Sequence, residues 1–191
     1  MYNIGLYHSF VTIVMVLQVI SSLIVYIPIL PEYIGLVLVG VISFIAPVFI
    51  YSKISGQKFL EMTGFKRLSL KNALYVVVLS VLVYPAVLIL ALITSLFFHN
   101  SVPEVLSDMG SRANPIAMFV IFCLSPAVCE EICFRGFLGS SLKRLGYRGA
   151  LLNGLYFGLI HLNFHQFFYA FALGILLYYM MVLGVIYWLE S

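Results

Sequence analysis

The sequence predicts an all-α membrane protein: a polytopic bundle of about six transmembrane helices around a polar intramembrane site. Of its 191 residues, 63% are hydrophobic and only 9% are charged, and the mean hydropathy is +1.12. Because soluble domains carry about 25% charged residues, this composition excludes a water-soluble fold and places the chain in a lipid bilayer. No internal repeat, low-complexity tract or linker divides the chain, so we expect residues 1–191 to form a single transmembrane domain.

Each expected span is an apolar stretch bounded by polar residues, glycines or prolines, and a span needs about 20 residues. The stretches cover residues 9–26, 33–52, 72–98, 115–139, 149–161 and 166 to the end. Pro47 predicts a kink in the second span. Asn114-Pro115 predicts the start of the fourth, with Asn as N-cap and Pro at the first helical position. In the fifth, Gly154 and Gly158 predict close packing against another helix.

The basic residues predict the orientation. Eight of the ten Lys and Arg residues lie in the loops 53–71 and 140–148, beside a single acidic residue, Glu61. The two loops fall on the same side of the membrane when the spans alternate. The positive-inside rule therefore predicts that both loops and the N-terminus are cytoplasmic, in a multi-pass protein of the plasma membrane. The net charge of +3 is explained by this orientation, and no nucleic-acid partner is expected.

Three charged residues, Glu130, Glu131 and Arg135, lie inside the fourth span in the stretch CEEICFRG. A charge at the centre of a membrane helix costs about 2.5–3.5 kcal/mol, so such residues face protein or water and mark functional sites. On an α-helix, Glu131 and Arg135 are four residues apart and can neutralise each other. Glu130 has no such cation, and a desolvated carboxylate of this kind suits general acid–base catalysis. The alternative interpretation is a structural ion network between helices.

The fifth span carries a second polar candidate, His161, four residues after Phe157. His161 lies about 18 Å from the cytoplasmic end of its span and Glu130 about 14 Å from the same side, at 1.5 Å per residue. The similar depth predicts that the two side chains meet. A hydrogen-bonded polar group without a catalytic role is the alternative for His161. For His165, at a predicted helix break, interfacial polarity is a sufficient explanation.

The two motifs together resemble those of the CPBP family, the CAAX-processing and bacteriocin-processing (Abi) intramembrane proteases. The resemblance rests on EExxxR at Glu130, Glu131 and Arg135 and on FxxxH at Phe157 and His161, and it covers residues of about 115–178. It implies a helical bundle that cleaves peptide bonds of membrane-associated proteins or peptides, prenylated proteins among them.

The resemblance also implies roles for the site residues. Glu130 would activate the attacking water, and Glu131 and Arg135 would shape and support the site. His161 would hold the water, a metal ion or the oxyanion, with Phe157 in a supporting position. The family chemistry is either zinc-dependent, with Glu130 and His161 as ligands here, or metal-free.

One feature of the family is missing from the sequence: a third motif, with a His followed four residues later by Asn. No His follows His165, so we expect either a truncated chain or a degenerate member, with little peptidase activity in residues 1–191. Two other functions stay open. A non-catalytic member could act in bacteriocin immunity or as an interaction partner. A proton-coupled transporter could use the Glu and His as a relay, although the lack of inverted repeats and the few spans argue against it.

Overall fold

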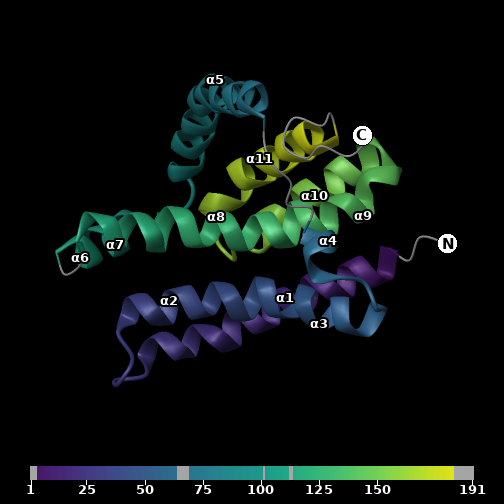
Figure 1. The fold of residues 1–191 in the computed structure, drawn as a ribbon. Coiled ribbons are helices and arrows are strands. Elements are labelled where there is room, and N and C mark those ends of the chain that lie inside the picture. The colour runs from purple at the N-terminus through teal and green to yellow at the C-terminus, as the bar shows by residue number, and fades with distance from the viewer. Residues whose placement is uncertain (1–3, 64–68, 101, 112–113, 183–191) are drawn as a thin grey trace. The chain divides into compact units, whose positions relative to one another are not determined.

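The computed structural model describes residues 4–63, 69–100, 102–111 and 114–182, and within these ranges it contains helices and connecting turns but no strand (Figure 1). Five helices are long and apolar enough to cross a membrane by length and composition. They cover Gly5–Tyr26, Glu32–Ser55, Leu70–Ser95, Pro115–Leu145 and Phe164–Val182. The predicted all-α membrane fold is confirmed, and the chain is an integral membrane protein.

The number of long helices differs from the expected six in one element. Helix α10 (Tyr147–Leu159), which corresponds to the expected fifth span, has only 13 residues. It is therefore about 20 Å long, shorter than the 30 Å apolar core of a bilayer. The helix ends early because an irregular turn at residues 160–163, with Leu162 at a φ of +50°, follows it and the next helix, α11 (Phe164–Val182), starts directly afterwards.

By their internal contacts the residues form two compact units, Met1–Met62 with Ser101–Cys133 and Thr63–Asn100 with Phe134–Ser191. In the element names, η marks a helical stretch of 3₁₀ or π type. The first unit holds α1 (Ile4–Ser21), η1 (Ser22–Tyr26), α2 (Glu32–Gly40), η2 (Val41–Ile45), α3 (Ala46–Ser55), most of α4 (Phe59–Thr63), α6 (Val102–Gly110), α7 (Pro115–Phe119), η3 (Val120–Leu124) and α8 (Ser125–Glu130). The expectation of a single domain stays a prediction.

Small residues let the helices of the first unit approach closely. A Cβ atom at Gly40 of α2 would lie 3.2 Å from the Sγ atom of Cys129 on α8, the residue before Glu130. The buried hydroxyls of Ser21 and Ser43 hydrogen-bond at 3.1 Å between the first two long helices. These contacts give the stretch leading to Glu130 a packed protein environment on the α2 side.

Two of the long helices contain turns of π type, in which hydrogen bonds run from residue i to i+5. Each of these turns, η2 and η3, ends directly before the helical segment whose second residue is a proline, Pro47 in α3 and Pro126 in α8. A proline lacks the N–H that an α-helix needs and clashes with the carbonyl four residues earlier. The wider turn relieves both problems, so the predicted irregularity at Pro47 takes this form.

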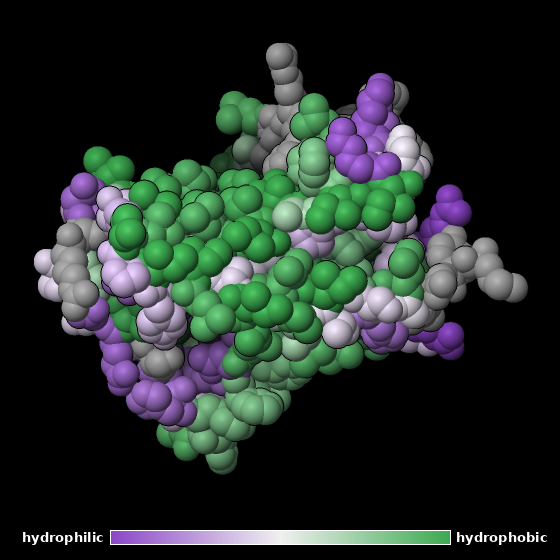
Figure 2. Space-filling view, turned by 90° about the horizontal axis from the view of Figure 1, so that it is seen from below, coloured by the Kyte–Doolittle hydropathy of each residue, from purple (hydrophilic) through white to green (hydrophobic). Residues whose placement is uncertain are grey.

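The second unit contains η4 (Glu131–Gly139), apart from its first three residues, and the helices that follow it. Its other elements are α5 (Leu70–Ser95), α9 (Ser140–Leu142), η5 (Lys143–Leu145), α10 and α11. Leu74, Val81, Leu82 and Leu92 of α5 are each more than 60% exposed, as expected for side chains that face lipid. Figure 2 shows a face of the molecule on which hydrophobic residues predominate and hydrophilic residues gather toward the ends.

Helices α10 and α11 form an antiparallel hairpin and lie side by side (Figure 1). A Cβ atom at Gly174 would lie 2.8 Å from the Cα atom of Gly154, and one at Gly158 would lie 2.9 Å from the Phe167 ring. The buried amide of Asn153 donates to the Gly174 carbonyl at 2.9 Å. The close helix packing predicted from Gly154 and Gly158 is confirmed, and α11 is the partner.

Candidate functional site

The charged motif lies where the Pro115–Leu145 helix changes from α to π type. Glu130 is the last residue of α8 and Glu131 the first of η4, and both side chains are half-buried. Arg135 is buried, with 5% of its surface exposed. Because hydrogen bonds in η4 run from i to i+5, the α-helical spacing assumed for Glu131 and Arg135 does not describe this segment. Their ion pair stays a prediction.

Arg135, Phe157 and His161 form a stack within the second unit. The Arg135 guanidinium carbon lies 4.9 Å from the centre of the Phe157 ring, a cation–π distance. The centre of the His161 ring lies 5.1 Å from that of Phe157, in an edge-to-face arrangement. The Phe134 ring approaches Phe157 edge-on at the same centre-to-centre distance of 5.1 Å. Phe157 therefore links the buried cation to His161, which gives this sequence-predicted supporting residue a physical role.

A glycine allows the charged segment to pack closely beside another part of the second unit. A Cβ atom at Gly136, directly after Arg135, would lie 2.7 Å from the carbonyl oxygen of Thr63. Distances below 3 Å force the surrounding backbone to move, so only glycine fits here. Gly136 thus fixes the position of the turn that carries Arg135.

His161 is held in a defined orientation by the end of its own helix. Its Nδ1 atom lies 2.7 Å from the Phe157 carbonyl oxygen. A carbonyl only accepts, so Nδ1 carries the proton and donates it. In the neutral ring, Nε2 then keeps its lone pair and can accept a hydrogen bond from water or bind a metal ion. Ligating or water-binding histidines are commonly oriented by such a second hydrogen bond.

His165 is buried, with only 3% of its surface exposed, and neither ring nitrogen has a hydrogen-bond partner in the described part of the chain. Its predicted location at the membrane interface stays a prediction, because burial among protein atoms does not give the depth in a bilayer. Asn163 caps α11: its side-chain oxygen accepts from the His165 backbone N–H at 2.8 Å. This places His165 in the first helical turn. An Asn two residues before a second histidine is the signal that could have indicated it.

The described residues do not assemble a three-ligand metal site. Within the ranges described, no group of three or more His, Cys, Asp and Glu side chains is placed to hold a metal ion. A catalytic zinc site uses three protein ligands and a water molecule. The two predicted ligands, Glu130 and His161, belong to different units, so the metal dependence stays a prediction.

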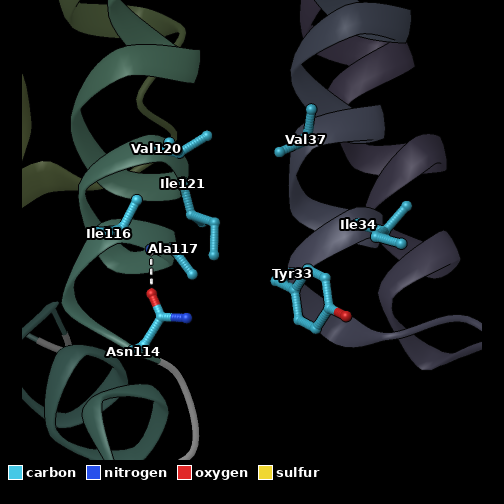
Figure 3. A pocket seen from close by; sticks show the side chains of 8 residues that line it. All are labelled: Tyr33, Ile34, Val37, Asn114, Ile116, Ala117, Val120 and Ile121. Atoms are coloured by element: carbon cyan, nitrogen blue, oxygen red, sulfur yellow. Dashed lines mark hydrogen bonds between the residues drawn. The ribbon is translucent and has the colours of Figure 1, made fainter.

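A separate pocket lies in the first unit, between α2 and the start of the Pro115–Leu145 helix (Figure 3). Its volume is about 430 Å³. Its lining consists of Tyr33, Ile34, Val37, Asn114, Ile116, Ala117, Val120 and Ile121. The Asn114 side chain accepts from the Ala117 N–H at 2.8 Å, which confirms the predicted N-cap. Glu130 lies nine residues beyond Ile121, about 14 Å along the helix, so the pocket is distinct from the charged motif.

The structure places three of the predicted site residues in contact, and it does not test whether Glu130 lies beside His161. Arg135, Phe157 and His161 are in contact in the second unit, as the stack shows. Glu130 and Glu131 belong to the first unit. The predicted meeting of Glu130 with His161 stays a prediction.

Comparison with known proteins gives one family. Residues 112–188 match the family model described as type II CAAX prenyl endopeptidase Rce1-like. The matched segment contains both motifs and His165. No curated protein and no solved structure matches the chain significantly. The resemblance to CPBP proteases that these motifs carry is confirmed by this match.

Proposed function

We propose that the chain is an intramembrane endopeptidase, because residues 112–188 match the Rce1-like family model. The observation that carries the proposal is the extent of the match, which includes Glu130, Arg135 and His161 in one segment. The substrate class is a membrane-associated protein or peptide. Because the family is described as a prenyl endopeptidase, a prenylated peptide ending in a CAAX sequence is the first substrate to test.

Glu130 is the general base in the proposed reaction. Its carboxylate takes a proton from a water molecule while the water oxygen bonds to the scissile carbonyl carbon and the carbonyl electrons move onto the oxygen. When the tetrahedral intermediate collapses, the C–N bond breaks and Glu130 returns the proton to the leaving amine. Glu131 and Arg135 support the site, since buried charges need compensation to remain in a membrane protein.

His161 positions the attacking water in this proposal. Its Nδ1 proton is committed to the Phe157 carbonyl at 2.7 Å, so the neutral ring offers Nε2 as an acceptor for a water O–H. The Phe157 ring, between Arg135 and His161, keeps the imidazole in place. No step of the proposed reaction is assigned to a metal ion.

The distribution of the basic residues supports a proposal for the orientation of the chain in its membrane. We propose a plasma-membrane protein with a cytoplasmic N-terminus, because eight of the ten Lys and Arg residues lie in the two loops expected on that side. The same loops explain the positive net charge, so no nucleic-acid partner is proposed. The immediate partners are the lipid bilayer and the substrate.

The experiment compares the wild-type protein with Glu130→Gln in proteoliposomes. A farnesylated CAAX peptide is the substrate, and the released peptide is quantified by mass spectrometry. Glu104→Gln, a change of the same kind at an exposed residue of α6, is the control. We expect slow cleavage by the wild type and by Glu104→Gln, and none by Glu130→Gln. Equal cleavage in all three proteins contradicts the role of Glu130, and no cleavage in any of them favours the non-catalytic alternative.

A further inference from the structure

His165 is a buried imidazole whose hydrogen-bonding capacity is unused within the described chain. Only 3% of its surface is exposed, and among the residues that the structure describes neither Nδ1 nor Nε2 has a hydrogen-bond partner. An imidazole carries at least one N–H donor in either protonation state. Buried donors without a partner are rare because they lose their bond to water and gain nothing in return. The partner of His165 is therefore expected to be a molecule that enters the site.

The fold places His165 at the same end of the α10–α11 hairpin as His161. His161 lies in the turn of residues 160–163 that follows α10, and His165 is the second residue of α11. Leu162 in this turn has a φ of +50°, a left-handed conformation that is uncommon for a residue other than glycine. Asn163 holds the start of α11 by accepting from the His165 N–H at 2.8 Å. The two histidines are thus presented by one rigid turn.

The predicted orientation places the turn deep in the bilayer when measured along either helix. The Tyr178 hydroxyl donates to the carbonyls of Leu142 and Lys143, in the segment that the charge pattern predicts to be cytoplasmic. From Tyr178 back to Phe164 is 14 residues of α11, or about 21 Å. From Gly149 to His161 is 12 residues, or about 18 Å. Irregular backbone at this depth is tolerated only where it is buried in protein or lines a water-filled cavity.

The proposed reaction has one role without a residue. The developing oxyanion needs an N–H donor aimed at it, and such donors usually make the largest electrostatic contribution to peptide hydrolysis. His161 uses its Nδ1 proton on the Phe157 carbonyl, so its neutral ring does not supply that donor. His165 has an uncommitted N–H close by in the chain, at the same end of the hairpin.

We propose that His165 is a further catalytic residue, which donates its imidazole N–H to the carbonyl oxygen of the scissile peptide bond as that oxygen becomes an oxyanion. The inference rests on the proposed endopeptidase function. The hydrogen bond is strongest when the water oxygen has bonded to the carbonyl carbon and the carbonyl electrons reside on oxygen. It weakens again when the C–N bond breaks and the carbonyl re-forms, so no proton leaves His165 during the cycle.

The test separates binding of the oxyanion from turnover. A farnesylated peptide with a phosphinic group in place of the scissile amide carries a tetrahedral, anionic centre, whereas the parent peptide does not. We expect His165→Phe to lower the affinity for the phosphinic peptide about 100-fold and cleavage about 10²–10³-fold, as for loss of one oxyanion donor. Affinity for the parent peptide, measured in a Glu130→Gln background that prevents cleavage, should change less than threefold.

Three comparisons complete the experiment. His165→Gln keeps an N–H donor and should recover part of the phosphinic-peptide affinity, while His8→Phe, on the exposed face of α1, should behave as wild type. Because Phe removes an unpaired polar group, His165→Phe should melt no lower than the wild type. A lower melting temperature with a parallel loss of both affinities indicates a structural role and overturns the proposal, as does unchanged phosphinic-peptide binding. His165-dependent binding combined with Glu130-independent cleavage contradicts the proposed base and leaves the role of His165 intact.

Discussion

Gly174→Ala tests whether the tight α10–α11 contact holds the candidate site in place. A Cβ atom at this position would lie 2.8 Å from the Gly154 Cα atom, 2.9 Å from the Phe157 Cβ atom and 3.2 Å from the Asn153 carbonyl oxygen. Non-bonded carbon atoms prefer separations of about 3.5–4.0 Å, so the helices must part by about 0.7–1.2 Å. The atoms in the way belong to backbone or to the root of a side chain and cannot turn aside.

The expected consequences concern both stability and activity. Overpacking of this kind costs about 1–3 kcal/mol of unfolding free energy. For a chain of this size, each kcal/mol lowers the melting temperature by about 2–4 °C. The displaced atom at Phe157 carries the ring that contacts Arg135 and His161. A misplacement of about 1 Å near a reacting group can lower the rate about 100-fold, so activity should fall further than stability explains.

Thermal unfolding in detergent and cleavage of the farnesylated peptide are the two measurements. Gly110→Ala in α6 is the matched control, because a Cβ atom there has its nearest neighbour, the Met118 Cε atom, 4.0 Å away. Ala is favoured over Gly in a helix by about 0.5–1 kcal/mol, so the control should be neutral or slightly stabilised. If Gly174→Ala has the same melting temperature as the control and cleaves at the wild-type rate, the tight α10–α11 contact does not hold the site in place.

Four further predictions follow from the site and its surroundings. Glu131→Gln should lower the melting temperature while Glu130→Gln should not, because only Glu131 is expected to neutralise Arg135; equal shifts would contradict this division of roles. Cysteines placed at Gln57 and Ser141, in a protein without its three native cysteines, should resist impermeant thiol reagents in intact cells, and labelling of either would reverse the orientation. Incubation with EDTA should change the cleavage rate less than twofold, and a loss that zinc restores would show that a metal ligand set had been overlooked. Tyr178→Phe should cost about 1–3 kcal/mol of unfolding free energy by removing the hydroxyl donor from the Leu142 carbonyl, whereas the Lys143 carbonyl keeps its bond from the Gly146 N–H; unchanged melting would show that water replaces the hydroxyl.

Local patterns in the sequence predicted local structure well. The apolar stretches gave the long helices, Asn114-Pro115 gave a helix start with the expected cap, and Gly154 and Gly158 gave a close helix contact. Each of these features is decided by a few neighbouring residues. The motif at Glu130 and His161 was also sufficient to indicate the family, because its residue types at that spacing are costly in a membrane and unlikely without a function.

Features that depend on distant packing were not predicted. The length of α10 is decided by the turn at residues 160–163, and His165 lies inside α11 because Asn163 starts this helix two residues earlier than hydropathy indicates. A polar residue near a helix break looks interfacial when only the sequence is considered, since its depth follows from how the two helices pair. The π-type segment Glu131–Gly139 was not predicted either, because no proline follows it in the sequence as one follows η2 and η3.

The π-type turn η3, which ends shortly before Pro126, limits the insertions and deletions that the Pro115–Leu145 helix can accept. A turn closed by i to i+5 bonds contains one residue more than an α-helical turn, and one residue corresponds to about 100° of rotation in an α-helix. An α-helical wheel drawn through residues 114–130 would therefore place Glu130 on the wrong side of the helix relative to Asn114. Many side chains can be exchanged in η3, but the loss of one residue would turn the carboxylate away from its present direction. Along this stretch, chain length is under stricter constraint than amino-acid identity.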